Sequence, residues 1–187
     1  MHGHRRFLYD DPGRKQWQDP EAILAEVGLA PGMTFIDFGC GEGFFALPAA
    51  KMTGSDGRVY GIDISEESVN ALARTALELG LDNLTAVSGP GENTLVCDVC
   101  ADMVFFGIDL HDFADPAEVL DNARAMIKPQ GRLVDLDWKK EPMELGPPLE
   151  IRFDEEKAKN LIEGAGFRVD SVADYGPFHY LITAMPI

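Results

Sequence analysis

The sequence lacks several features that would place it in a special class of protein. It has no apolar run long enough to cross a membrane and no basic, apolar start of the kind that directs secretion. Basic residues are few, because 16 Lys and Arg accompany 32 Asp and Glu in 187 residues, which gives a net charge of −16. Such a charge repels nucleic acid and anionic membranes. We therefore expect a cytoplasmic protein that binds no nucleic acid and does not insert into a membrane, and we leave its oligomeric state open.

Cysteine is also scarce, and the three residues are an odd number, which argues against a disulfide framework. Cys97 and Cys100 form a C-x-x-C pair, which could be redox-active or supply half of a zinc site. No second pair follows, and His111 is the nearest histidine in the sequence. We therefore expect Cys97 and Cys100 to be two small unpaired thiols at the entrance to a strand, and we predict no metal site.

Short apolar strands alternate with amphipathic helices from residue 32 onward. One helix has an especially clear pattern, because Val69, Leu72 and Ala76 recur on one face and Gly80 follows as a stop. This alternation is typical of an α/β fold with a mostly parallel sheet that helices cover on both faces. The expected strands are 33–38, 58–62, 84–88, 102–107, 132–138, 167–176 and 178–186, and the expected helices are 20–27, 42–52, 66–79, 116–127 and 154–163.

The chain shows no internal repeat, low-complexity tract or break in composition. We therefore expect a single domain over residues 1–187, with a core over 32–187 and an N-terminal arm and helix over 1–31. The stretch "YDDPGRKQWQD" in the arm carries two aromatic residues among charges and has no clear periodicity. It is interpreted equally well as a lid over a ligand or as a chain end that lies on the core.

The stretch "FIDFGCGEGFF" places three glycines directly after an apolar strand. In an open parallel sheet, ligands bind beyond the carboxyl ends of the strands. Gly39, Gly41 and Gly43 let a ligand approach the backbone, and the N–H groups of a helix starting near Glu42 favour a negatively charged group. Asp37, inside the strand, is expected to brace the loop by accepting backbone hydrogen bonds. The loop therefore predicts a polar, partly anionic ligand.

The spacing of the glycines indicates which ligand this is. A dinucleotide loop of the form G-x-G-x-x-G would need glycine at position 44, where this chain has Phe44. Asp63 ends the second strand in "VYGIDIS", where its carboxylate suits the two hydroxyls of a ribose. The sequence therefore indicates an adenosine without a pyrophosphate, and it disfavours a nucleotide-dependent oxidoreductase.

Five stretches occur in a characteristic order: "FIDFGCGEGFFALPAA", "VYGIDIS", "ENTL", "ADMVFFGIDLHDFADP" and "IKPQGRLVDLDW". Together they resemble the class I S-adenosylmethionine-dependent methyltransferases over almost the whole chain. The similarity is greatest to the small UbiE-like group, which is related to quinone C-methyltransferases and arsenite methyltransferases. The resemblance implies a Rossmann-like, seven-stranded, mostly parallel sheet with an antiparallel last strand. It also implies S-adenosylmethionine as the methyl donor, with S-adenosylhomocysteine as the product.

The resemblance also implies where each part of the donor binds. The glycine loop would line the methionine, and Asp63 would hold the ribose. Ile64 would flank the adenine, whose edge would face Glu92 and Asn93, while the end of the fourth strand would lie beside the sulfonium. The residues expected to bind the cofactor are Asp37, Gly39, Cys40, Gly41, Gly43, Asp63, Ile64, Glu92, Asn93, Phe106 and Gly107.

Methyl transfer needs a general base only when the acceptor atom carries a proton that must leave. We select His111, in "GIDLHDF" after the fourth strand, as the candidate base, and we select Asp109 to orient it or to bind the acceptor. A purely structural interpretation remains open, in which Asp112 and Asp115 cap the next helix and His111 packs beneath them. The aromatic residues of the tail either wall an acceptor pocket or fill the core; they are Trp138, Tyr175, Phe178, His179 and Tyr180.

The expected function is methyl transfer to a small-molecule acceptor, because little of the chain is left over for a separate recognition domain. Two alternatives remain, a protein side-chain methyltransferase and a catalytically silent module that binds S-adenosylmethionine. An arsenite-type enzyme would need several cysteines that converge on the methyl group. Cys40 alone is expected near the donor, so this activity is disfavoured.

Overall fold

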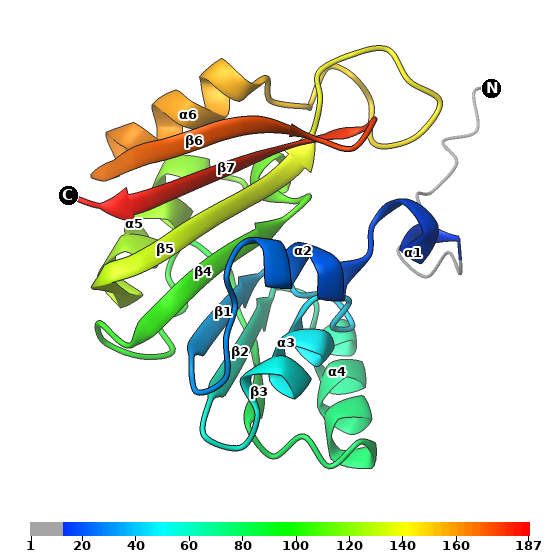
Figure 1. The fold of residues 1–187 in the computed structure, drawn as a ribbon, viewed down its shortest axis with the longest axis vertical. Helices are drawn as coiled ribbons and strands as arrows, with labels where there is room; N and C mark the ends of the chain where they lie inside the picture. The colour runs from blue at the N-terminus through cyan, green and yellow to red at the C-terminus, as the bar shows by residue number, and fades with distance from the viewer. Residues whose placement is uncertain (1–12) are drawn as a thin grey trace.

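A computed structural model describes residues 13–187, and these residues form a seven-stranded sheet with the order β3-β2-β1-β4-β5-β7-β6 (Figure 1). Strands β1 to β5 pair in parallel, and β7 runs antiparallel to both of its neighbours, β5 and β6. The predicted antiparallel last strand is therefore confirmed. The strands are β1 (Thr34–Phe38), β2 (Arg58–Asp63), β3 (Leu84–Ser88), β4 (Ala101–Gly107), β5 (Ile127–Trp138), β6 (Phe167–Tyr175) and β7 (His179–Pro186).

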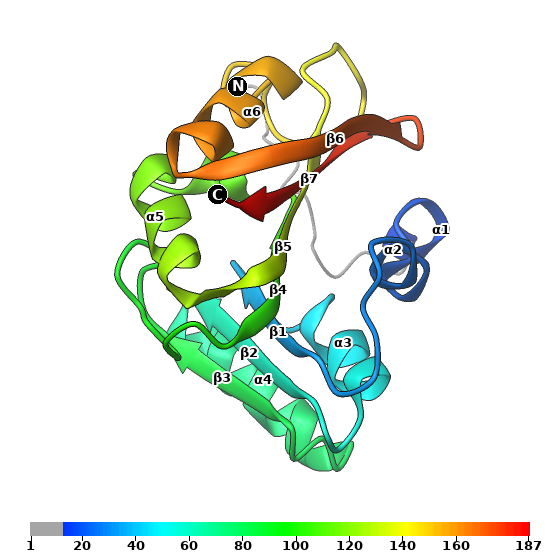
Figure 2. The ribbon, with the colours of Figure 1, turned by 60° about the vertical axis from the view of Figure 1, so that its left-hand side comes forward.

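Helices cover both faces of the sheet (Figure 2). In the described residues, one apolar cluster joins the sheet to α5 and α6, and a second joins the opposite face to α2, α3 and α4. No helix within residues 13–187 has the length and apolar character needed to cross a bilayer. The helices are α1 (Arg14–Trp17), α2 (Pro20–Glu26), α3 (Ala46–Thr53), α4 (Glu66–Glu78), α5 (Pro116–Met126) and α6 (Glu155–Gly164), with a short 3-10 helix η1 (Leu110–Asp112).

Side-chain caps fix where several of these helices begin. The side chains of Asp19, Ser65, Asp115 and Asp154 each accept a hydrogen bond from a backbone N–H in the first turn of the helix that follows. These residues precede α2, α4, α5 and α6, which begin within one residue of the predicted positions. Because a cap is a local feature of the sequence, these boundaries were predictable without knowledge of the fold.

Two boundaries differ from the prediction by more than one residue. Helix α3 begins at Ala46 and not near Glu42, because Gly43 has a φ of +98°, which no residue in a right-handed helix adopts. The glycine loop is therefore longer than expected. Strand β5 begins at Ile127 and not at Arg132, since it also includes the "KPQG" stretch, which lies between the predicted helix and the predicted strand.

The expectation of two free thiols at the C-x-x-C motif is wrong. Cys97 and Cys100 form a disulfide, with their Cα atoms 6.0 Å apart, a separation within the normal range for such a bond. The chain reverses between the two residues, and this brings together two side chains that an extended strand entrance would have kept apart. Cys40 is a buried free thiol.

Arg152 fixes the segment between β5 and α6. The residue is 4% exposed, and all three nitrogens of its guanidinium group donate hydrogen bonds to backbone carbonyl oxygens. The acceptors belong to Lys139, Glu141, Leu145 and Pro147, at distances of 2.6 to 3.2 Å. One buried cation therefore holds a segment of more than ten residues that has no helix or strand of its own.

We predict that Arg152→Met lowers the free energy of unfolding by about 2–4 kcal/mol, because it leaves buried carbonyl groups without donors. Arg168→Met is the matched control, since Arg168 is exposed and its guanidinium group pairs with Asp170. The control should stay within about 0.5 kcal/mol of the wild type. Chemical denaturation measures both values, and equal stability of the two variants would show that Arg152 does not hold this segment.

Candidate functional site

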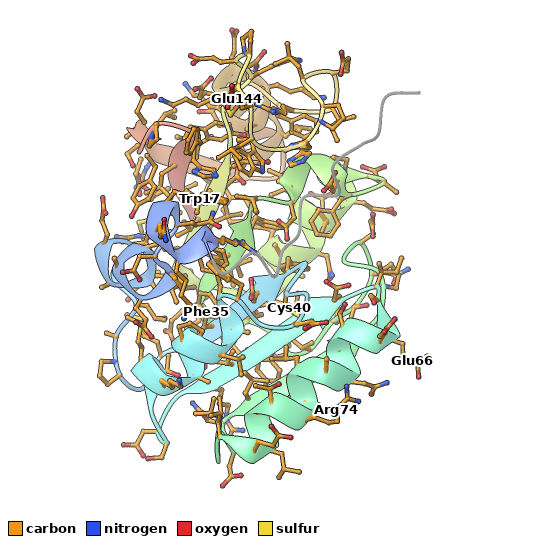
Figure 3. The ribbon with its side chains drawn as sticks, turned by 90° about the vertical axis from the view of Figure 1, so that its right-hand side faces the viewer. Trp17, Phe35, Cys40, Glu66, Arg74 and Glu144 are labelled. Atoms are coloured by element: carbon orange, nitrogen blue, oxygen red, sulfur yellow. A yellow bond between two sulfur atoms is a disulfide. The ribbon has the colours of Figure 1, made fainter. Side chains whose placement is uncertain are left out.

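The carboxyl ends of β1, β2, β4 and β5 meet at one edge of the sheet, as the parallel pairing requires. Figure 3 views the molecule from this side, where the loop that contains Cys40 lies below Trp17 of α1. The predicted site residues lie at the ends of β1, β2 and β4 or in the segments that follow β1, β2, β3 and β4. Their convergence at one edge is therefore a consequence of the strand order.

The three glycines of the loop after β1 serve different purposes. A Cβ on Gly39 would collide with the carboxylate of Asp109, and one on Gly43 would collide with Leu72 of α4. A Cβ on Gly41 would meet no atom within 4 Å, although its φ of +52° favours glycine. Gly39 and Gly43 are thus needed for packing, and Gly41 is the glycine that leaves space for a ligand.

Asp63 fastens the glycine loop to the end of β2. Its Oδ2 accepts a hydrogen bond from the Gly41 N–H at 2.8 Å, and its Oδ1 accepts one from the Ser65 N–H at 2.8 Å. The next residue, Ile64, is 77% exposed, which is unusual for so large an apolar side chain beside buried strands. The end of β2 therefore offers a carboxylate and, directly beside it, an uncovered apolar surface.

Two carboxylates with buried oxygens, those of Asp37 and Asp109, interact electrostatically near the glycine loop. The Oδ2 atom of Asp37 and both carboxylate oxygens of Asp109 have no hydrogen-bond partner among residues 13–187. Burial, with a further contribution from Asp63, raises the pKa of Asp37 to about 8, although Arg14 and the backbone of Ala46 partly offset the shift. Burial and the charge of Asp37 raise the pKa of Asp109 well above its usual range. A cation bound close to both carboxylates would stabilise their ionised forms and so lower both pKa values.

His111 forms a buried pair with Asp137, which is the second-last residue of β5. Its Nδ1 lies 2.8 Å from Asp137 Oδ2, and its Nε2 has no hydrogen-bond partner in the described part of the chain, with Asp112 Oδ1 3.4 Å away. Burial lowers the pKa of His111, but the hydrogen bond and charge of Asp137 outweigh it, so the net shift is upward. Asp137 is therefore the hydrogen-bond partner of the His111 ring, whereas Asp109, which the sequence suggested for orienting the ring or binding the acceptor, lies against Gly39.

Comparison with known proteins assigns the family. The model of a methyltransferase domain matches residues 29–171. A crystal structure of an S-adenosylmethionine-dependent methyltransferase from Aquifex aeolicus superposes with a TM-score of 0.90 at 35% identity, over 95% of each chain. This chain belongs to the S-adenosylmethionine-dependent methyltransferases.

Relatives of known activity match less of their own length. Nocamycin O-methyltransferase of Saccharothrix syringae is 34% identical over 127 residues, which are 67% of this chain and 45% of that protein. An arsenite methyltransferase of Halobacterium salinarum is 25% identical over 148 residues, 79% of this chain and 36% of that protein. The methyltransferase thus spans less than half of the length of these two curated relatives.

The residues at the edge fit the cofactor of this family. A positively charged amino group would satisfy the unpartnered oxygens of Asp37 and Asp109, and a flat apolar ring would cover Ile64. Gly41 leaves open space at the loop, and Asp63 retains lone pairs for hydroxyl groups. The fit rests on orphaned polar atoms and an uncovered apolar side chain, which are properties of this structure alone.

The other predicted cofactor residues differ in how they can act. Cys40 is 5% exposed in the methyltransferase and packs beside Gly61, and burial raises the pKa of its thiol well above the usual range. Phe106 is fully buried against Phe38, with ring centroids 5.0 Å apart, so its side chain cannot reach a ligand at the edge. For Cys40 and Phe106, as for Gly107, the backbone is the part that could face a cofactor.

The stretch predicted to border the adenine lies between β3 and β4. The Glu92 Oε1 atom accepts a hydrogen bond from the Asp115 N–H at 3.3 Å, and Asn93 is exposed. Asp115 also caps α5, as the structural interpretation of "DLHDFADP" expected. The same interpretation gave His111 no partner, whereas the structure pairs it with Asp137.

An aromatic cluster lies where α1 meets β5 and β7. The centroid of the His179 ring lies 4.4 Å from that of Trp138 and 5.6 Å from that of Trp17, on which the His179 ring stacks. The Phe178 ring meets the Trp17 ring edge-on, with centroids 6.1 Å apart. Tyr180 belongs to the cluster on the opposite face of the sheet, with α5 and α6. The tail aromatics, which the sequence left open as a pocket wall or as core, are therefore divided between two faces of the sheet.

Sequence reasoning did not place Trp17 beside His179, and it did not identify Asp137 as the partner of His111. Trp17 lies in a short helix without apolar periodicity, and only contacts with distant residues show its place. Asp137 had a usable signal, because "LVDLDW" alternates acidic and apolar residues inside a buried strand. Residues 1–12, which include part of the proposed lid, lie outside the described residues. No group of three or more His, Cys, Asp or Glu within residues 13–187 is placed to hold a metal ion.

We predict that Asp37→Asn stabilises the cofactor-free protein at high pH. The folded state keeps a proton on Asp37 up to about pH 8, whereas the unfolded state loses it near pH 3.8, so wild-type stability falls as the pH rises through this interval. The variant carries no charge there. Its Tm should exceed that of the wild type by a margin that grows from pH 4 to pH 8, with about 2–4 °C for each 1 kcal/mol relieved.

The measurement is a series of thermal melts across this pH range. Glu78→Gln is the control, because Glu78 is an exposed side chain of α4. A Tm difference between Asp37→Asn and the wild type that does not change with pH would contradict a protonated, buried Asp37.

Proposed function

We propose that this methyltransferase transfers a methyl group from S-adenosylmethionine to a hydroxyl group of a small molecule. The observation that carries the proposal is the buried His111–Asp137 pair, which leaves the Nε2 atom of His111 without a hydrogen-bond partner among the described residues. A hydroxyl is a poor nucleophile until its proton leaves, so such an acceptor makes use of a base. The UbiE-like placement and the cytoplasmic location remain predictions.

The proposed cofactor site uses residues at or after the ends of four neighbouring strands, β1, β2, β3 and β4. Asp37 and Asp109 bind the amino group of the methionine, Asp63 accepts hydrogen bonds from the ribose, and Ile64 covers one face of the adenine. Glu92 and Asn93 border the edge of the adenine, and the backbone of the glycine loop and of Phe106 and Gly107 lines the methionine and the sulfonium. The remaining proposed members of this site are Gly39, Cys40, Gly41 and Gly43.

When bound, S-adenosylmethionine supplies an electrophilic methyl group on a sulfonium and a neutral thioether as the leaving group. The protein contributes alignment and proton transfer. His111 Nε2 accepts the proton of the acceptor hydroxyl, and Asp137 holds the ring through Nδ1 and stabilises the imidazolium that forms. In this proposal the half-exposed side chain of Asp112 turns aside so that the hydroxyl reaches Nε2.

Charge limits the class of acceptor. The chain carries a net charge of −16, so a strongly anionic acceptor would be repelled. The name of the Saccharothrix relative describes O-methylation, which agrees with a hydroxyl acceptor. An arsenite-type activity is not favoured, because Cys97 and Cys100 are bonded to each other and Cys40 is buried. A protein side chain as acceptor and a silent binding module remain the alternatives.

We predict that the purified protein binds S-adenosylhomocysteine and that Asp63→Ala weakens the affinity by about tenfold or more, because charge-assisted hydrogen bonds to the ribose are lost. Calorimetric titration gives both affinities. Asp82→Ala is the control, since Asp82 is exposed at the opposite edge of the sheet, before β3. A preference for NADH over S-adenosylhomocysteine would refute the cofactor assignment.

We predict that methyl transfer to a hydroxyl acceptor rises with pH through the pKa of His111, which lies above 6.5, because only the neutral ring accepts a proton. Asp137→Asn should move this rise to lower pH, since it removes the carboxylate that contributes most to the upward shift of the His111 pKa. His111→Ala should reduce kcat by about 100-fold or more while leaving S-adenosylhomocysteine affinity within about threefold of the wild type.

The assay follows labelled methyl groups from S-adenosylmethionine into a panel of phenols and alcohols, and NMR titration gives the His111 pKa directly. Asp112→Asn should lower the pKa of His111 by less than Asp137→Asn does, because the charge of Asp112 contributes less to the upward shift. An unchanged pH profile in Asp137→Asn would reduce the pair to a structural role. Cofactor binding without transfer to any acceptor would favour the silent module.

A further inference from the structure

The Cys97–Cys100 disulfide closes a tight ring just before β4. Both cysteines are half-buried, and the two residues between them, Asp98 and Val99, are exposed. A partly exposed disulfide in a ring of this size can be reached by a dithiol, whereas a disulfide in the core cannot. The bond is remote from the proposed base, so it has no part in methyl transfer itself.

The ring is one end of a segment that α5 holds along its whole length. At the start of the segment, the Asn122 side chain donates to the carbonyl oxygens of Gly91 and Thr94, at 2.7 and 3.0 Å. At the end, the Cys100 N–H donates to Met126 O at 2.8 Å. Glu92 and Asn93 lie between Gly91 and Thr94, at the start of this segment. The segment therefore connects the disulfide to the proposed adenine edge.

The conformation of Val99 depends on this ring. Its φ is +46°, a left-handed conformation that a β-branched residue rarely adopts. The Val99 N–H donates to Ala125 O at 3.3 Å, which is a long hydrogen bond. Such a conformation persists only where its surroundings impose it, and the disulfide is the covalent constraint at this position. Without the bond, Val99 can return to an extended conformation and release the contact with α5.

We propose that Cys97 and Cys100 form a reversible thiol–disulfide site whose oxidation state sets the affinity of the protein for the adenosine half of its cofactor. The inference rests on the proposed placement of the adenine beside Glu92 and Asn93. In the oxidised state the segment over 89–100 is already ordered, and cofactor binding does not have to order it. In the reduced state this ordering takes place on binding and weakens the affinity.

The reaction is an exchange of two electrons and two protons. One thiolate of a dithiol reductant attacks one sulfur of the bond, so that a mixed disulfide forms and the other cysteine leaves as a thiol. The second thiol of the reductant then attacks its own sulfur in the mixed disulfide and releases the first cysteine. The protein gains two S–H groups, and the reductant becomes a disulfide. Because binding and oxidation are linked, the cofactor must favour the oxidised form by the same factor by which oxidation favours the cofactor.

The test combines a thiol count with an affinity measurement. The protein as purified in air should alkylate at one cysteine, Cys40, after denaturation without reductant, and at three after treatment with dithiothreitol. Titration with S-adenosylhomocysteine should give an affinity about three- to tenfold weaker in the reduced state. The double variant Cys97→Ser/Cys100→Ser is the control, since it should bind like the reduced wild type and should not respond to dithiothreitol.

A second readout needs no affinity measurement. At a fixed ratio of reduced to oxidised dithiothreitol, saturating S-adenosylhomocysteine should raise the ratio of oxidised to reduced protein by the same factor. Equal affinity in the two oxidation states would overturn the inference and leave the cofactor site intact. Three free thiols in the air-oxidised protein would overturn it as well. Absence of S-adenosylhomocysteine binding in both states would refute the proposed cofactor site and the switch together, while the thiol count would still report the bond.

Discussion

The interior carboxylates at the reactive edge are the constraint on which the rest of the structure depends. Asp37, Asp109, Asp135 and Asp137 all have buried carboxylate oxygens, and several of them raise one another's pKa. The cost of burying the carboxylate is met in a different way at three of these residues. Asp137 has His111 as a partner, and Asp37 is partly compensated by Arg14 and the Ala46 backbone, whereas burial favours a protonated Asp135. An apolar edge would be more stable, but it could not attract the amino group of a cofactor or hold a base.

The alternation of side chains along β5 places neighbouring residues of this region on opposite faces of the sheet. Successive residues of a strand point to opposite faces, so Asp137 and Trp138 at the end of β5 project in opposite directions. Asp137 meets His111 on the face covered by α5 and α6, and Trp138 meets His179 and Trp17 on the other face. The two histidines consequently behave differently: the pKa of His111 is raised, whereas burial and nearby cations lower the pKa of His179 to about 3.

Most of the fold was accessible from the sequence, because its signals are local. Apolar runs marked the strands, and residues that cap helices in the structure, such as Ser65 and Asp154, lie within one residue of the predicted helix starts. What failed depended on the path of the chain in three dimensions. Gly43 delays the first turn of α3, the chain reverses between Cys97 and Cys100, and the partner of His111 comes from a strand 26 residues away in the sequence. Spacing could suggest a base at His111, but it could not choose among the acidic residues that might orient it.

The hairpin of β6 and β7 has a consequence for how such an enzyme diversifies. Its turn brings Phe178 and His179 to the aromatic cluster, while the glycine loop, Asp63 and Ile64 all precede residue 65. The sheet keeps these two regions apart, because β1 and β2 lie on one side of β4 and the hairpin lies on the other (Figure 1). Substitutions in the hairpin therefore change one end of the sheet, and substitutions in the glycine loop, at Asp63 or at Ile64 change the other.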